Sequence, residues 1–168
     1  MANTIWYKED PEIIGMSNGL TSSFINVIGL SGSKSAVKDY EKNLIIFLLE
    51  KDQSRVGIGT VGFDICTMPW NKNVFKEQKQ FLIKVCENAL QKDEWDKLDY
   101  EPSYEMLFNP IRSFTSLLKK MNPEDIDETE SEGWLKELED ERSNENKYPV
   151  CEIHNTLLTC FGCQICND

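Results

Sequence analysis

The sequence contains a single histidine, and the motifs of several enzyme classes are absent from its 168 residues. There is no GxxxxGK[ST] phosphate loop and no GxSxG nucleophile elbow. A cysteine or serine nucleophile normally needs a basic partner, and the only histidine, His154, belongs to a metal-ligand pattern. Abundant carboxylates leave acid–base catalysis open, but on an acidic surface their number is not a signal. We therefore expect that the protein is not an enzyme.

The glycines at 57, 59 and 62 have the G-x-G-x-x-G spacing of a dinucleotide fingerprint but lack its sequence context. The fingerprint must follow a strand and open a helix. Here Pro69 interrupts the chain after the last glycine, and no helical periodicity begins before Val74. We expect a bulged strand or a close backbone approach at these glycines, and no dinucleotide cofactor.

The chain also lacks long apolar runs. None approaches the roughly 20 residues that a helix needs to cross a bilayer. Its first residues, MANTIWYKEDPEII, have neither the basic start nor the apolar stretch of a signal peptide. We therefore expect a soluble, cytoplasmic protein with no membrane partner, in a reducing compartment that favours metal binding over disulfides. Its length and its 40% apolar content suit one domain with a genuine core.

Positive charge is scarce, and negative charge is concentrated in one segment. The net charge is −11, and the segment 122–147 contains eleven acidic and three basic residues, a net charge of −8. Such a surface repels nucleic acid, so we expect no nucleic-acid partner, whereas a basic protein would be attracted. The alternative is a solvated, partly disordered acidic linker, which is the usual meaning of a charge run.

Metal-ligand residues gather in the last eighteen residues of the chain. Cys151, His154, Cys163 and Cys166 form the pattern C-x2-H-x8-C-x2-C. A tetrahedral zinc site takes four nitrogen and sulfur ligands, and a spacing of two residues lets one tight turn direct both ligands of a pair at one ion. We predict one structural zinc ion held by these four residues, because four protein ligands close the ion to water. Cys160 could replace one of them.

Two other interpretations of the tail stay open. The cysteines could cluster by chance near a flexible terminus, or Cys160 and Cys163 could close a small redox loop. For the zinc site, Leu157 and Leu158 lie between the ligand pairs, where a short hairpin could turn them onto the body of the protein. Gly162 supplies the backbone freedom that a knuckle turn favours. Cys66 and Cys86 have apolar surroundings and are predicted to be inert core thiols.

Hydrophobic periodicity predicts a mixture of helices and short strands. The expected elements, in chain order, are a strand at 5–7, an apolar group at 24–30 ended by a break at 29–33, a helix at 34–51 capped by Ser33 or Ser35, one or two strands at 56–65, a helix at 74–90, a helical turn at 104–108, a helix that Asn109 caps and Pro110 opens through Met121, and a short helix docked by Trp134.

These elements predict an α+β fold in which several helices pack on a small, mainly antiparallel sheet, with a zinc ribbon-like hairpin at the C-terminus. By composition we divide the chain into an α+β core at 1–121, an acidic segment with a short helix at 122–149, and a Cys/His zinc-binding tail at 150–168.

Four segments of the sequence resemble a known family. They are Cys66-Thr-Met-Pro-Trp70, then F-x-x-Q-K-x-F-L-x-K-V from Phe75, then W-x-x-L-x-Y-E-P from Trp95, and the tail C-x2-H-x5-C-x-G-C-x2-C. Together they resemble the small cytoplasmic immunity proteins encoded beside bacterial polymorphic or contact-dependent growth inhibition toxins, over about residues 56–121 and the tail. The resemblance implies a non-catalytic antitoxin that binds one cognate toxin domain, often a nuclease with a basic groove, and blocks its active site or a neighbouring surface.

We therefore expect an immunity protein that neutralises a basic toxin domain, most plausibly a nuclease, through its acidic segment. A tryptophan among carboxylates is a good protein-binding anchor, although it could equally fill the core. The residues predicted to bind the toxin are Asp125, Asp127, Glu128, Glu130, Glu132, Trp134 and Glu137. The alternatives are a zinc-containing adaptor or regulatory protein-binding module and, as a third class, a metal-dependent hydrolase.

Overall fold

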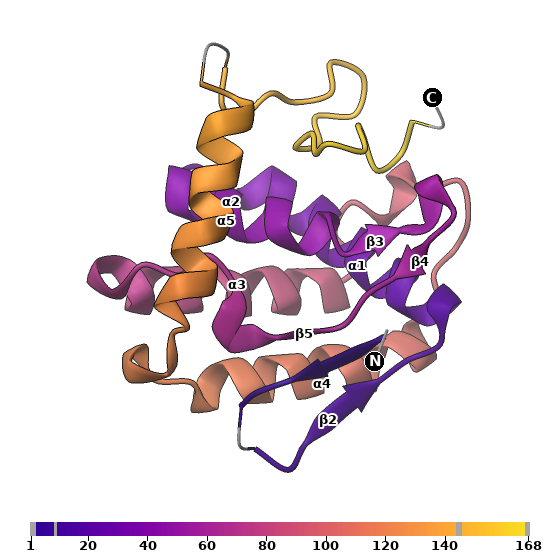
Figure 1. Ribbon diagram of the computed structural model, residues 1–168. Helices are drawn as coiled ribbons and strands as arrows, with labels where there is room; N and C mark the ends of the chain where they lie inside the picture. The colour runs from indigo at the N-terminus through magenta and orange to yellow at the C-terminus, as the bar shows by residue number, and fades with distance from the viewer. Residues whose placement is uncertain (1–2, 9, 144–145, 167–168) are drawn as a thin grey trace.

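The computed structural model describes residues 3–8, 10–143 and 146–166 (Figure 1). Its five helices pack on a small mixed sheet, which confirms the predicted α+β class. The helices are α1 (Asn18–Ser35), α2 (Asp39–Leu49), α3 (Phe75–Leu90), α4 (Tyr104–Lys120) and α5 (Glu128–Glu141). The strands are β1 (Thr4–Trp6), β2 (Ile13–Gly15), β3 (Asp52–Gln53), β4 (Gly59–Thr60) and β5 (Phe63–Asp64).

The strands form a three-stranded sheet and a separate short hairpin. In the sheet, β1 is central, with β2 antiparallel on one side and β5 parallel on the other. The antiparallel hairpin joins β3 to β4 and contains Gly57 and Gly59, whose φ angles are +80° and +91°. A residue with a side chain rarely adopts such angles, so glycine is required there by the turn. The chain continues into β5 and a 3-10 turn (Ile65–Thr67) rather than into a helix.

One hydrophobic core joins the whole described chain. It extends from Ile5 in β1 through α1 to α4 and includes Ile126 of the acidic segment and Leu157 of the tail. Within this core, Phe24 of α1 and Phe114 of α4 meet edge to face, with ring centroids 5.5 Å apart. The three segments that differ in composition therefore share a core, and the tail is packed on the body.

Helix α1 corrects the prediction for residues 24–51. The predicted break at 29–33 is wrong, because α1 runs through it to Ser35, and the predicted helix at 34–51 is shortened to α2. Gly29 and Gly32 lie where α1 touches other parts of the chain: a Cβ at Gly32 would overlap the Ile45 side chain, and one at Gly29 would overlap that of Leu49. The glycines therefore allow close helix packing instead of ending the helix.

Helix α4 corrects a second boundary. The predicted separate turn at 104–108 and the Asn109 cap are wrong, because one helix spans Tyr104–Lys120 with Pro110 inside it. Ser103 caps its start by accepting a hydrogen bond from the Met106 amide. Proline removes one hydrogen bond from the second turn, and the buried face of α4, which includes Ile111, keeps the helix in place. The predicted helix at 74–90 is confirmed as α3.

Helix α5 confirms the short helix predicted in the acidic segment. Asp127 caps it by accepting from the Glu130 amide, and Ser131 donates to the carbonyl oxygen of Met68. Trp134 packs edge to face on Phe47 of α2, which docks α5 on the body. In Figure 1, α5 stands upright across α2, and the tail crosses the top of the molecule. In the described residues, no helix combines the length and apolar character needed to span a membrane.

Candidate metal centre

The first ligand pair lies on a tight backbone turn. The amide of Cys151 donates to the carbonyl oxygen of Thr156 at 2.9 Å, and the amide of Asn155 donates to that of Cys151 at 2.8 Å. Asn155 has a φ of 57°, a left-handed conformation that asparagine tolerates better than most residues. The turn brings Cys151 and His154 onto the same side, as the two-residue spacing predicts.

The second ligand pair follows another turn. Thr159 and Gly162 exchange backbone hydrogen bonds of 3.3 and 3.0 Å, and Gly162 has a φ of 87°, so the predicted use of glycine in this turn is confirmed. Two isolated antiparallel bridges, Val150 with Leu157 and Thr159 with Gly162, give the described tail its ribbon-like course. Leu157 between the pairs is buried in the core, as expected, whereas Leu158 is only half-buried.

The structure brings the four preferred ligands together. The ligand atoms of Cys151, His154, Cys163 and Cys166 all lie within 4.8 Å of one another. His154 Nδ1 is 3.6, 3.7 and 3.3 Å from the sulfur atoms of Cys151, Cys163 and Cys166, and the Cys151 and Cys166 sulfur atoms are 3.7 Å apart.

These four distances are close to those between the ligands of a tetrahedral ion. With bonds of about 2.3 Å to sulfur and about 2.0 Å to nitrogen, a tetrahedron places two sulfur atoms about 3.8 Å apart and a sulfur and a nitrogen about 3.5 Å apart. The four residues are therefore close enough, and of the right chemistry, to hold one metal ion.

The surroundings of the cluster lower the pKa of Cys163 and raise that of Cys166. Burial opposes ionisation of Cys163, but hydrogen bonds from Thr156 and from the amides of Cys166 and Ile165 outweigh it and lower the pKa of Cys163 to about 6. Thr156 Oγ1 lies 2.9 Å from this sulfur. Hydrogen bonding to Cys151 and partial burial raise the pKa of Cys166 to about 11, and the neighbouring charge on Cys163 adds to the shift. A divalent cation would remove this repulsion and allow all three thiols to ionise.

Cys160 lies apart from the cluster. It is exposed at the tip of the turn between Thr159 and Gly162, and it does not belong to the group of close ligand atoms. Partial desolvation and the charge of Glu50 raise its pKa. The described residues include all six cysteines, and each of them is a free thiol. Cys160 and Cys163 therefore form no disulfide that would close a redox loop.

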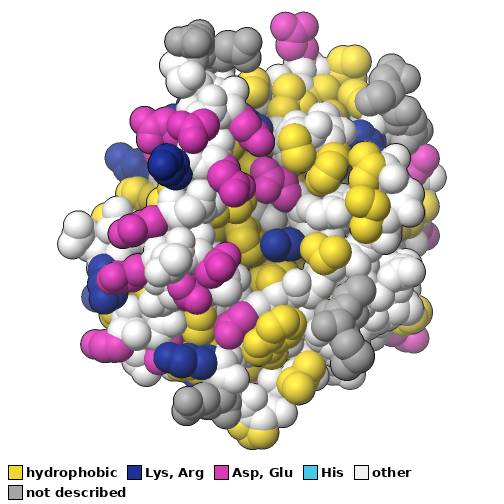
Figure 2. Space-filling view, in the orientation of Figure 1, with side chains coloured by type: hydrophobic (Ala, Val, Ile, Leu, Met, Phe, Trp, Pro, Cys, Tyr) yellow, Lys and Arg dark blue, Asp and Glu magenta, His cyan; other side chains and the backbone are white. Residues whose placement is uncertain are grey.

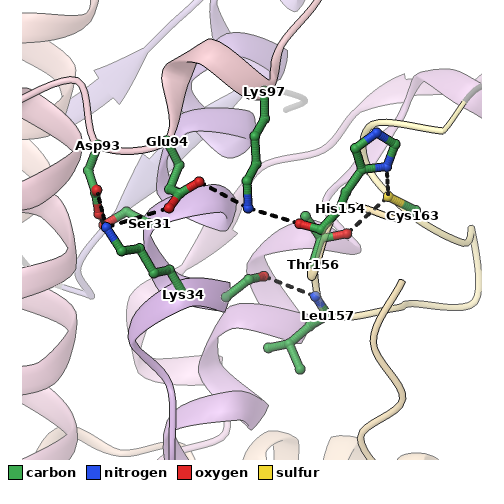
Figure 3. Close-up of polar contacts among 10 residues, drawn as sticks. Ser31, Lys34, Asp93, Glu94, Lys97, His154, Thr156, Leu157 and Cys163 are labelled. Atoms are coloured by element: carbon green, nitrogen blue, oxygen red, sulfur yellow. Dashed lines mark hydrogen bonds and ion pairs between the residues drawn. The ribbon is translucent and has the colours of Figure 1, made fainter. Parts of the chain in front are cut away.

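Contacts with α1 and the 91–98 loop hold the cluster against the body (Figure 3). Lys97 Nζ donates to the carbonyl oxygen of His154 at 2.9 Å and pairs with Glu94. The amide of Leu157 donates to Ser33 Oγ at 3.0 Å. Gln164 Nε2 donates to the carbonyl oxygen of Asn26 in α1 at 3.0 Å. Sequence reasoning did not find these anchors, because their spacings along the chain are long and carry no motif.

The other two cysteines are core thiols, as expected. Cys66 and Cys86 are buried, and burial raises the pKa of each to about 12. Neither lies in the ligand cluster.

The residues predicted to bind a toxin fall into two groups. Several have contacts within the fold: Asp125 accepts hydrogen bonds from Tyr7 Oη and the Asn122 amide, Asp127 caps α5, and Glu128 pairs with Lys72 at 2.6 Å. Trp134 is half-buried, and its Nε1 donates to Glu50 Oε2 at 3.1 Å. Glu130, Glu132 and Glu137 are exposed on α5. Glu145, the last acidic residue of the segment, lies outside the described residues.

Comparison with known proteins adds no assignment: no protein-family model, curated protein or solved structure matches this chain.

Proposed function

We propose that the tail binds one structural zinc ion through Cys151, His154, Cys163 and Cys166. The proposal rests on the agreement between the distances in the cluster and those of a tetrahedral site. Three thiolates and one imidazole leave no position for a water ligand, so the ion would stabilise the tail and not activate a nucleophile. Native mass spectrometry of protein purified without chelator should show one zinc ion per chain. Substoichiometric zinc after such a purification would contradict the proposal.

We further propose that the protein is an immunity protein, and that the outer face of α5 binds a basic toxin domain, most plausibly a nuclease. The supporting observation is that acidic side chains gather over α5 and outnumber the basic side chains among them (Figure 2). Glu128 pairs with Lys72, and no other carboxylate of α5 forms an ion pair within the described residues. A basic surface would supply the missing partners and would be attracted over long range.

The test is co-expression with the product of the adjacent upstream gene. The proposal expects a complex that co-purifies, salt-sensitive binding, and rescue of growth from the toxicity of that product. The absence of both complex and rescue would refute it. Recovery of a non-enzymatic partner would instead favour the zinc-containing adaptor.

A charge-matched pair of variants locates the surface. Replacing Glu130, Glu132 and Glu137 by glutamine keeps good helix formers on α5 and removes three charges from its exposed face. The control replaces exposed glutamates on α3 and α4 by glutamine, with the same change in net charge: Glu77, Glu87 and Glu105. The first variant should weaken the complex much more than the control. Equal weakening would show that net charge alone, and not α5, carries the binding.

A further inference from the structure

A cavity of about 230 Å³ opens where the C-terminal end of α2, one side of α5 and the tail turn at 159–162 meet. Its apolar surfaces come from Trp134 and Leu138 of α5 and from Phe161 of the turn. Three carboxylates also line it: Glu50, Glu137 and Glu141. Gln53 and Cys160 complete the lining, so the cavity is more polar than apolar and combines aromatic rings with converging carboxylates.

Glu50 is in an unfavourable position for a carboxylate. It is half-buried at the C-cap of α2, where the helix dipole is negative. Burial raises its pKa, and the charge of Glu141 adds to the increase, whereas the hydrogen bond from Trp134 and the charges of Arg142 and Lys51 oppose it only in part. A partly desolvated carboxylate beside a second carboxylate is a group whose charged form a nearby cation stabilises.

The charges of Arg142 and Lys51 lower the pKa of Glu50, but neither side chain forms an ion pair with it. Lys51 Nζ lies over the rings of Phe47 and Phe63, 4.4 and 5.8 Å from their centroids. Arg142 donates to the carbonyl oxygens of Lys147 and Leu158 at 2.7 and 2.9 Å. Within the described residues, Glu50 therefore has no ion pair, and a cation from outside can occupy the cavity.

We propose that this cavity receives an arginine side chain of the basic partner, an inference that rests on the proposed function. A guanidinium group is planar, stacks on aromatic rings and pairs with carboxylates through two parallel hydrogen bonds. The hydrogen bond to Glu50 fixes the Trp134 ring beside the carboxylates. A metal ion fits less well, because among the described residues only the Cys/His cluster brings metal ligands close enough together.

The metal centre shapes one wall of this cavity. Phe161 lies two residues before the ligand Cys163, and Arg142 at the end of α5 holds the tail through the Leu158 carbonyl oxygen. Removing the metal should therefore open the cavity while the carboxylates of α5 stay in place. We expect arginine binding in the cavity to depend on zinc. The general attraction of basic proteins to α5 should not depend on zinc.

The indole N–H of Trp134 provides a direct reporter, because it bonds to Glu50. The probe is N-acetyl-arginine amide, titrated into the zinc-loaded protein and followed by ¹⁵N–¹H NMR, with the Trp134 signal assigned from a Trp134→Phe spectrum. A saturable shift of this signal is expected. It should be absent with neutral N-acetyl-norleucine amide, roughly tenfold or more weaker in Glu50→Gln, and unchanged in Glu139→Gln, which neutralises an exposed charge of α5 outside the cavity.

Three results would overturn the proposal: no saturable shift, an equal shift with the norleucine probe, or equal affinity in Glu50→Gln. The indole signals of the other three tryptophans show whether each variant is folded. The two proposals can fail separately. Arginine binding without any toxin complex would refute the immunity function alone, and a toxin complex unaffected by Glu50→Gln would refute the arginine site alone.

Discussion

Replacing Cys166 by serine tests whether the tail is ordered by a metal ion or by packing. Cys166 suits this test because its sulfur is only part-buried, and its side-chain contacts are with Cys151 and His154 in the cluster. Serine removes one thiolate ligand and leaves the contacts between the tail and the body in place. Cys160→Ser is the matched control, because it makes the same change in the same tail at a residue outside the cluster.

The free energy that the metal ion must supply can be estimated from the contacts that residues 150–166 make with the body. Burial of Leu157 contributes about 2 kcal/mol. Hydrogen bonds join five residues of the tail to the body and contribute about 1 kcal/mol each; the residues are Leu157, His154, Gln164, Leu158 and Phe161. Ordering these seventeen residues costs at least about 17 kcal/mol. These contacts with the body fall short of the ordering cost by about 10 kcal/mol, and structural zinc supplies about 10–16 kcal/mol to small domains.

Amide hydrogen exchange is the assay. In Cys166→Ser the amides of the tail should lose protection, while those of α1, α3 and α4 keep theirs, because Leu157 is the one tail residue in the described core. Cys160→Ser should resemble the wild type. Unchanged protection of the tail in Cys166→Ser without bound metal would show that packing alone orders it and would refute this reasoning.

Three further predictions concern packing and charge. Gly32→Ala should lower the free energy of unfolding by about 1–3 kcal/mol through overpacking, whereas Gly133→Ala, with open space around it on α5, should raise it by about 0.5–1 kcal/mol; denaturant unfolding of both variants checks this. Tyr7→Phe should lower the free energy of unfolding by about 1 kcal/mol at pH 7, and by less as the pH falls below 3.8, because the Tyr7 hydroxyl lowers the pKa of Asp125. Denaturant unfolding at pH 7 and pH 3 tests this, and an equal loss at both pH values would contradict it. Glu50→Gln should raise the free energy of unfolding at pH 7 but not below pH 4.5. The pKa of Glu50 is raised in the folded protein, so its ionisation lowers stability as the pH rises. Denaturant unfolding at both pH values checks this, and a loss of stability at pH 7 would contradict it.

The metal ligands could be predicted because the information is local. Two-residue spacings place Cys151 with His154 and Cys163 with Cys166 on single turns whatever the rest of the fold. The structure also separates Cys160 from the preferred set, which the sequence could not do, because its exclusion depends on the direction of the Thr159–Gly162 turn.

Helix α1 shows why other features could not be predicted. It is buried on most sides, so its apolar residues have no clear 3.6-residue period. Gly29 and Gly32 look like helix breakers in the sequence, and their role appears only when the packing of Leu49 and Ile45 is known. The same holds for the cavity at Glu50, since it joins three segments that are far apart in the chain.

X-ray absorption at the zinc edge is the decisive test of the closed metal site, because it counts the ligands of the ion in the intact protein. The account predicts three sulfur ligands at about 2.3 Å and one nitrogen at about 2.0 Å, with no oxygen. In Cys166→Ser the sulfur number should fall, and in Cys160→Ser it should remain three. An oxygen ligand in the wild-type spectrum, or a sulfur number that depends on Cys160, would contradict the closed Cys151, His154, Cys163 and Cys166 site.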